Sequence, residues 1–295
     1  MQDATTISPV RARLNDVFVL TKVRLNTLVV ATTAGGYYMG APAEVSPLAL
    51  GVTCLGTALV AGGAAALNQV QERDLDRLMV RTRMRPMPDE RLSVTEGSAI
   101  GLGLCIGGVA ILWIGANLLA ATIALATALL YTLIYTPLKR KTSLNTVVGA
   151  VPGALPPLIG WAAARGSLDG AAPWTLFFVM FLWQLPHFLA IAWIYRDDYA
   201  RARLPMLPVI DPDGAMTGRQ AVLWAATLLP FSQLPFVMGL TNATYGIGAI
   251  LLGLGLFGVA LQFARRRTDA RARHLFYASI VYLPVLWVLM AIGRN

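Results

Sequence analysis

A cluster of carboxylates follows the second long apolar run of this chain. Glu72, Asp74 and Asp76 lie within five residues, directly after hydrocarbon-rich sequence. Carboxylates are costly beside hydrocarbon, so a cluster placed at a membrane edge indicates a use for them. Asn68, Glu72 and Asp76 are spaced i, i+4 and i+8, which puts all three on one face of a continuing helix. Oxygen ligands of this kind, with basic residues behind them, suit Mg²⁺ that holds a diphosphate.

A second acidic cluster lies four apolar runs further along the chain. It consists of Asp197 and Asp198, flanked by Tyr195 and Tyr199, directly after the sixth apolar run. A charged and solvated loop is the ordinary interpretation of one such cluster. Two clusters at matching positions favour a different interpretation. In it, the two acidic loops come from two halves of the molecule, face each other and close one polar site. A cation pathway is the third interpretation, and it is disfavoured because the apolar runs hold almost no ionisable residues.

Basic residues accompany the acidic clusters. Arg81 and Arg85 follow the first cluster, and Lys139 and Arg140 follow the fourth apolar run. Such residues hold loops on the cytoplasmic side of a membrane. They can also bind phosphate oxygens beside a metal ion. Both interpretations stay open for these four residues.

His187 is one of two histidines and lies inside the sixth apolar run. A histidine in such a run usually makes a hydrogen bond within a helical bundle, and it could also contact an iron porphyrin. Aromatic residues near the acidic clusters usually pack against other helices or anchor at the membrane interface. A few that face a cavity could stabilise an allylic cation through their π faces. The aromatic candidates are Tyr131, Tyr135, Trp183, Trp193, Tyr195 and Tyr199.

The apolar runs that must position these residues account for most of the chain. Of its 295 residues, 56% are hydrophobic and only 13% are charged, about half the charged fraction of a soluble domain. We therefore expect an all-α, polytopic membrane protein, folded as a single membrane-embedded domain over residues 1–295. A membrane span needs about 20 mostly apolar residues, and nine runs qualify. The predicted spans cover roughly residues 20–40, 47–69, 97–115, 117–137, 143–163, 173–194, 220–240, 244–264 and 274–292.

The net charge of +9 is distributed as in a membrane protein rather than a nucleic-acid-binding protein. All but two of the 24 Lys and Arg residues lie in the N-terminal segment or in the loops after predicted spans two, four, six and eight. Because basic loops stay on the cytoplasmic side, we expect a cytoplasmic N-terminus and a C-terminus outside. Residues 1–16 are expected to form a flexible cytoplasmic tail. Both acidic clusters then lie at the cytoplasmic face, where any chemistry is expected.

The pattern Asn68-x-x-x-Glu72-x-x-x-Asp76 resembles the first acidic motif of the intramembrane prenyltransferases of the UbiA type. Within that superfamily, the sequence is more similar to the protoheme IX farnesyltransferases, also called heme O synthases. Further resembling segments run in order from the first span to the seventh, and an ordered set of this kind is specific. The segments are Glu72–Met79, Arg81–Thr82, Arg85–Pro86, Tyr135–Arg140, Gly149–Pro157, Trp183–Phe188, Asp197–Tyr199 and Pro205–Pro208.

The chain departs from the family pattern at several positions. The second motif of the superfamily is usually Asp-x-x-x-Asp, and Tyr195 and Tyr199 stand at its two acidic positions here. This departure fits the heme branch better than the quinone branch, and both tyrosines are counted as catalytic candidates. Val23 stands where the family often has proline, and Arg203 where it often has glycine. Because tyrosines stand at the two acidic positions of the second motif, the resemblance leaves the ligands of a second metal ion open.

The resemblance implies a helical bundle around a central cavity, open to the lipid bilayer and to the cytoplasmic face of the bacterial inner membrane. It implies farnesyl diphosphate and heme B as substrates, heme O and diphosphate as products, consumption of water, and Mg²⁺ as cofactor. A heme A-forming enzyme or a terminal oxidase is a candidate partner. The alternatives are a prenyltransferase for an aromatic quinone precursor, and a membrane transporter or heme-handling protein without catalysis.

The resemblance also implies a role for each candidate residue. Glu72 and Asp76, with Asn68 assisting, are expected to bind Mg²⁺, and Asp198 to bind a second Mg²⁺ or orient its waters. His187 is the expected heme contact. Basic residues are expected to bind the substrate and to neutralise the charge that builds on the departing diphosphate. These basic residues are Arg24, Arg81, Arg85, Lys139 and Arg140.

Overall fold

Small polar residues and prolines set the ends of the long helices. Helix α3 (Pro47–Leu78) begins after Ser46, whose hydroxyl accepts a hydrogen bond from an N–H of the first turn. Helix α4 (Val94–Gly115) begins with a capping box formed by Ser93 and Glu96. Side chains at these positions satisfy N–H groups that the first helical turn leaves unpaired. These capping residues therefore fix the starts of α3 and α4 at the borders between polar segments and apolar runs.

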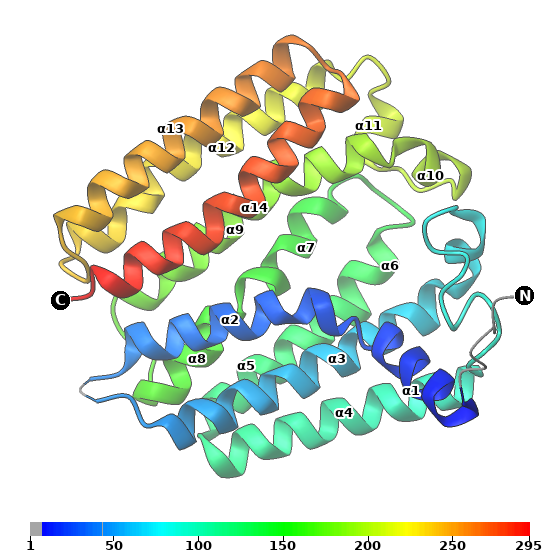
Figure 1. Ribbon diagram of the computed structural model, residues 1–295, viewed down its shortest axis with the longest axis horizontal. Helices are drawn as coiled ribbons and strands as arrows, with labels where there is room; N and C mark the ends of the chain where they lie inside the picture. The colour runs from blue at the N-terminus through cyan, green and yellow to red at the C-terminus, as the bar shows by residue number, and fades with distance from the viewer. Residues whose placement is uncertain (1–7, 43) are drawn as a thin grey trace, which may run out of the picture.

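The computed structural model describes residues 8–42 and 44–295, and its regular structure over those residues is helical apart from one isolated bridge (Figure 1). The other elements are α1 (Pro9–Leu20), α2 (Val23–Gly40), α5 (Leu118–Leu129), the π-helical η1 (Leu130–Tyr135), α6 (Thr136–Leu138), α7 (Asn145–Ala154), α8 (Pro156–Arg165), α9 (Ala172–Ile194), α10 (Arg196–Arg201), α11 (Leu207–Ile210), α12 (Ala215–Val237), α13 (Ala243–Arg265) and α14 (Asp269–Ile292).

Eight helical segments are long and apolar enough to cross a membrane, within the part of the chain that the structure describes. They correspond to the second through ninth predicted spans. In two of them a crossing is built from consecutive helices, α5 with η1 and α6, and α7 with α8. A ninth crossing results if α1 and α2 form one bent span; they meet at 51°, next to Lys22, whose φ of 50° is left-handed. The expected polytopic all-α fold is confirmed, and the ninth span exists only as this bent pair.

The long helices form two groups with α7 between them, and α8 packs mainly against α2 and α5 of the first group (Figure 1). One group contains α2, α3, α4 and α5, and the other contains α9, α12, α13 and α14. Helix α1, the connection from α3 to α4, and α10 and α11 gather at one end of the bundle, whereas the last turn of α14 lies at the other end. The segments that carry most of the basic residues and both acidic clusters therefore share one end of the molecule.

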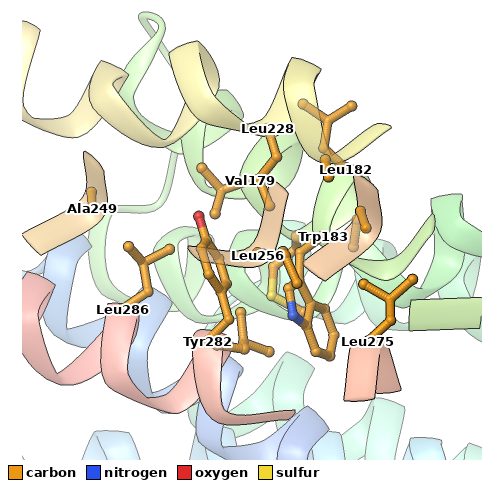
Figure 2. Packing of buried hydrophobic residues seen from close by; sticks show 14 of the residues in the cluster. Val179, Leu182, Trp183, Leu228, Ala249, Leu256, Leu275, Tyr282 and Leu286 are labelled. Atoms are coloured by element: carbon orange, nitrogen blue, oxygen red, sulfur yellow. The ribbon is translucent and has the colours of Figure 1, made fainter. Parts of the chain in front are cut away.

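Helices α9, α12, α13 and α14 enclose a large buried apolar core. Trp183 and Tyr282 lie in the middle of this cluster (Figure 2), and Trp183 Nε1 donates a hydrogen bond to the Ser279 carbonyl at 2.8 Å. On its outer side, α13 exposes large apolar residues such as Ile247 and Leu251. A continuous apolar exterior of this kind marks a membrane-facing surface.

Helix α1 is attached to the rest of the bundle by polar contacts. Asp16 is buried, and its Oδ1 lies 3.0 Å from Arg91 Nε. Gln69 Nε2 donates a hydrogen bond to the Leu20 carbonyl at 2.6 Å, which satisfies an unpaired acceptor at the end of α1. The flexible tail predicted over residues 1–16 is therefore replaced by a helix from Pro9 onward, and residues 1–7 lie outside the described part of the chain.

Candidate active site

The last turns of α3 carry the predicted polar face. Asn68, Glu72 and Asp76 are 1%, 6% and 1% exposed, and the helix continues without a break to Leu78. Their spacing therefore places three buried polar side chains along one side of the helix, as the sequence predicted. A buried carboxylate is costly unless a cation or a hydrogen-bond donor lies beside it. The contacts of these side chains consequently define the site.

Each of the two buried carboxylates has a basic partner from another segment of the chain. Lys139 Nζ donates to Glu72 Oε1 at 2.7 Å, and Arg85 Nη1 donates to Asp76 Oδ2 at 2.9 Å. Burial tends to lower the pKa of Lys139, but the Glu72 carboxylate and the neighbouring tyrosines together outweigh burial and raise this pKa above its ordinary value. Lys139 is therefore positively charged. Of the predicted phosphate-binding residues, the structure brings Lys139 and Arg85 into direct contact with the acids.

Asn68 extends this cluster toward α2. Its Oδ1 accepts a hydrogen bond from Lys22 Nζ at 2.9 Å, and its Nδ2 donates to Thr136 Oγ1 at 3.0 Å. The hydroxyl of Tyr131, on the π-helical segment η1, lies 3.4 Å from the same Oδ1. Short π-helical segments often occur at functional sites. Lys22 was missed as a site residue from the sequence; a lysine at the start of an apolar run is the signal that could have identified it.

Asp198 connects the second acidic loop to the first. Its Oδ1 accepts a hydrogen bond from the Val80 N–H at 3.2 Å, its Oδ2 accepts one from the Arg81 N–H at 3.4 Å, and Arg201 forms an ion pair with it. Burial tends to raise the pKa of Asp198, but the hydrogen bonds from Arg201 and the two backbone N–H groups outweigh burial and lower this pKa. The two acidic loops are therefore in contact, as their matching positions in the sequence suggested.

Tyr195 and Tyr199 contact the first loop through Arg81. The guanidinium carbon of Arg81 lies 4.6 Å from the centre of the Tyr195 ring and 6.0 Å from the centre of the Tyr199 ring, within the range of cation–π attraction. Arg140 donates to a backbone carbonyl of α3 at 3.0 Å on the exposed side of that helix. Arg24 is exposed at the start of α2. These two arginines thus lie outside the buried cluster.

The oxygen donors of α3 suit a magnesium ion. Glu72, Asp76 and Asn68 offer carboxylate and amide oxygens, which are the hard ligands that Mg²⁺ prefers. Within residues 8–42 and 44–295, no three His, Cys, Asp or Glu side chains lie together as a group that could hold a metal ion. Asp198 therefore does not complete a preformed cage with the acids of α3. Mg²⁺ commonly binds through one or two carboxylates together with substrate phosphates, so two acids are sufficient.

His187 belongs to α9 and lies apart from the polar cluster, where its side chain packs against α14. Its ring stacks between those of Trp183 and Phe276, with ring centres 5.1 Å away on each side. Its Nδ1 lies 2.8 Å from Ser279 Oγ, and this hydroxyl donates to the Phe276 carbonyl at 2.6 Å. Because the hydroxyl proton is used in that bond, His187 Nδ1 must be the donor to Ser279, and Nε2 then carries the lone pair.

An apolar cavity of about 340 Å³ lies directly beside the polar cluster. Lys22, Tyr131 and Tyr135 line one end of it, and small or apolar side chains from α2, α3, α5, α7, α8 and α9 line most of the rest. A mainly apolar cavity with charged and hydroxyl groups at one end suits a ligand that has a polar head and a long apolar tail. The site therefore has separate places for the two parts of such a molecule.

A helical membrane bundle with buried acids, paired cations and an adjoining apolar cavity has the features of a membrane-embedded prenyltransferase. The chain belongs to the UbiA prenyltransferase family, whose model matches residues 28–283. It is similar to the protoheme IX farnesyltransferase of Solibacter usitatus (strain Ellin6076), with 44% identity over 290 residues that cover 95% of this chain and 99% of that protein. The family predicted from the ordered motifs is confirmed.

Solved structures share the fold. A digeranylgeranylglyceryl phosphate synthase superimposes with a TM-score of 0.79 at 15% identity, over 96% of this chain and 98% of the other. A UbiA homolog from Archaeoglobus fulgidus bound to GPP and Mg²⁺ superimposes with a TM-score of 0.65 at 15% identity, over 94% of this chain and 99% of the other. At such low identity these likenesses concern the fold alone.

Proposed function

We propose that this protein transfers a farnesyl group from farnesyl diphosphate to a vinyl group of heme B, with addition of water, to give heme O and diphosphate. The observation that carries the proposal is the buried cluster of paired acids and bases beside an apolar cavity. The acceptor follows from the protoheme IX farnesyltransferases that match this chain along nearly its whole length.

The cavity and the polar cluster suit the two parts of farnesyl diphosphate. The isoprenoid tail matches the apolar wall, and the diphosphate matches the end where Lys22, Arg85 and Lys139 lie. Arg85 and Lys139 now pair with the acids of α3, and Lys22 donates a hydrogen bond to the Asn68 amide oxygen. With Mg²⁺ and a diphosphate bound, Glu72 and Asp76 would hold the ion, and Lys22, Arg85 and Lys139 would be free to bind the phosphate oxygens. Both buried carboxylates would then keep a cationic partner throughout binding.

Magnesium is the proposed metal, held by Glu72 and Asp76 with Asn68 assisting. When bound, the ion neutralises the diphosphate and stabilises its departure. A carboxylate has about four lone-pair sites, so Asp198 keeps room beyond its three hydrogen bonds to bind a second Mg²⁺ or to orient its waters. Asp198 also holds the backbone of Arg81, and this fixes the loop that carries the guanidinium.

Aromatic and apolar side chains are proposed to control the cation that forms when the diphosphate leaves. The rings of Tyr131 and Tyr135 stack with their centres 5.4 Å apart and line the polar end of the cavity. Their π faces can stabilise positive charge on the first carbon of the farnesyl group. The apolar wall excludes bulk water until the vinyl carbon forms the new C–C bond; otherwise farnesol would form. Water then adds to the resulting cation and releases a proton.

His187 is the proposed heme contact. Its Nδ1 is fixed by Ser279, so Nε2 is the atom that can face an iron porphyrin. Stacking between Trp183 and Phe276 orients the imidazole ring. A metal-bound histidine usually has its second ring nitrogen fixed by a hydrogen bond in this manner.

The chain is proposed to act as one domain of 295 residues in the inner membrane of a bacterium, with a cytoplasmic N-terminus and the C-terminus outside. The distribution of basic residues supports this orientation. The reaction then takes place at the cytoplasmic face. A heme A-forming enzyme or a terminal oxidase is the proposed recipient of the product.

The test uses purified protein in lipid nanodiscs, supplied with farnesyl diphosphate, Mg²⁺ and heme B. Mass spectrometry of the extracted heme should show heme O, together with release of one diphosphate per heme. Chelation of divalent ions should stop both signals, and added Mg²⁺ should restore them. A protein that leaves heme B unchanged but prenylates an aromatic quinone precursor would contradict the proposal in favour of the quinone branch.

A further inference from the structure

The cavity beside the polar cluster has a closed end. Thr57 on α3, Ala124 on α5 and Ile159 on α8 are the lining residues furthest along their helices from the polar cluster. We call these three residues the floor, and all three are buried. We propose that the floor, and Ile159 above all, sets the length of the prenyl chain that this protein accepts. This inference rests on the proposed function, since it requires the prenyl tail to occupy the cavity.

The depth of the cavity can be measured along α3 and along α5 with η1, and the two values agree. Asn68 at the polar cluster and Thr57 at the floor are eleven residues apart, and so are Tyr135 and Ala124 on the adjoining segment. At 1.5 Å of rise per residue, each separation is about 16 Å along the helix axis. The eleven bonds of an extended farnesyl main chain span about 13 Å, at the reach per bond of an extended polypeptide. A farnesyl tail whose first carbon lies near Asn68 therefore ends within one helical turn of the floor.

Close packing of α8 against α2 prevents the cavity from continuing past the floor. A Cβ atom on Gly36 of α2 would collide with the backbone of α8, and one on Gly160 of α8 would collide with the backbone of α2. Close approach through small residues is typical of membrane helices, and Figure 1 shows the two helices crossing. Beyond the floor, Ala120 and Ala162 belong to a fully buried apolar cluster. A fourth isoprene unit, about 5 Å longer, would have to enter this packed core.

Ile159 is the bulky member of the floor, because the other two residues are threonine and alanine. It belongs to the same buried cluster as Val60 and Ala124. Its branched side chain therefore occupies the position that the fourth isoprene unit would need. Truncation to alanine removes three carbons there, and enlargement of Ala124 adds carbons at the same level. The two changes should shift chain-length preference in opposite directions.

The test measures kcat/KM for geranyl, farnesyl and geranylgeranyl diphosphate, with heme B as the acceptor and the full chain in nanodiscs. The wild-type protein should prefer farnesyl diphosphate. Ile159→Ala should raise the ratio of geranylgeranyl to farnesyl use by about tenfold, the scale on which an apolar pocket discriminates between chains that differ by a few carbons. Ala124→Leu should shift the preference toward geranyl diphosphate by a similar factor.

Leu158→Ala is the matched control, because Leu158 precedes Ile159 on α8, is 1% exposed and does not line the cavity. Its substrate ratios should equal those of the wild type, and thermal unfolding should verify that each variant is folded. An unchanged ratio in folded Ile159→Ala or Ala124→Leu protein would overturn the inference. So would an equal shift in the control, or a wild-type protein that uses geranylgeranyl diphosphate as well as farnesyl diphosphate. A wild-type protein that makes no heme O would instead reject the proposed function.

Discussion

The buried pair of Glu72 and Lys139 allows a quantitative test of the site. Their side chains are 7% and 16% exposed, and the charged atoms are 2.7 Å apart. Lys139→Met keeps most of the length of the side chain and removes its charge. It leaves the Glu72 carboxylate buried beside helices of low polarity. The variant should therefore lose stability as well as activity, and the two losses have separate causes.

The expected loss of stability follows from the geometry of the pair. At 2.7 Å and an effective dielectric constant of about 20, the attraction is about 6 kcal/mol before the cost of desolvation is subtracted. Removing one partner of such a buried pair costs about 3–5 kcal/mol, because the other charge is left unpaired. This corresponds to a fall of roughly 10 °C in the apparent unfolding temperature. The double variant Glu72→Gln with Lys139→Met buries no charge at this position and should recover most of the loss.

The assay compares the wild type, both single variants and the double variant. Tryptophan fluorescence follows thermal unfolding at one fixed scan rate, since unfolding of a membrane protein in detergent is governed by its rate. Heme O formation is measured on the same preparations. We expect turnover to be lost in all three variants, because the metal ligand, the phosphate contact or both are missing. Stability should be restored only in the double variant, which would show that the two side chains are coupled.

Lys141→Met is the matched control, because Lys141 follows Lys139 in the same loop and is exposed. Its stability should stay within about 0.5 kcal/mol of that of the wild type, so its unfolding temperature should hardly change. A double variant as unstable as Lys139→Met would refute the argument that an unpaired carboxylate causes the loss. Wild-type turnover in the Lys139→Met protein would refute the role of this lysine at the diphosphate.

Three further predictions concern other parts of the site. Asp76→Asn should abolish heme O formation while the protein still inserts, and calorimetry should show weaker binding of Mg²⁺ with diphosphate; unchanged binding would argue against a metal ligand. His187→Ala should weaken heme binding, and Ser279→Ala should weaken it less, with farnesyl diphosphate binding retained in both; spectroscopic heme titration measures this, and unchanged titration would assign the histidine a structural role. The lowered pKa of Asp198 means that its stabilising contribution is complete above about pH 4 and is lost as pH falls through the lowered value. Unfolding temperatures between about pH 2 and 4 should therefore depend less steeply on pH in Asp198→Asn than in the wild type.

The sequence by itself determined the features that depend on neighbouring residues. Long apolar runs identified the membrane helices, because a span requires about 20 apolar residues in succession. The spacing of Asn68, Glu72 and Asp76 identified a polar helix face, because four residues make about one turn. The ordered motifs identified the family. The bend at Lys22 and the helix that begins at Pro9 were not predicted, since a short segment of mixed polarity has no strong periodicity.

Only the tertiary structure decided which residues meet. Lys139 contacts Glu72 across 67 positions of sequence, and Asp198 binds the backbone of Arg81 across 117 positions. Arg24 has the same charge as Lys22 and lies two residues away, yet it is exposed while Lys22 contacts Asn68. Composition cannot distinguish such cases, because the packing of helices fixes which face of each turns inward. The floor of the cavity shows the same limit: in the sequence Ile159 is one apolar residue among many, and its place at the closed end follows from the close contact of α8 with α2.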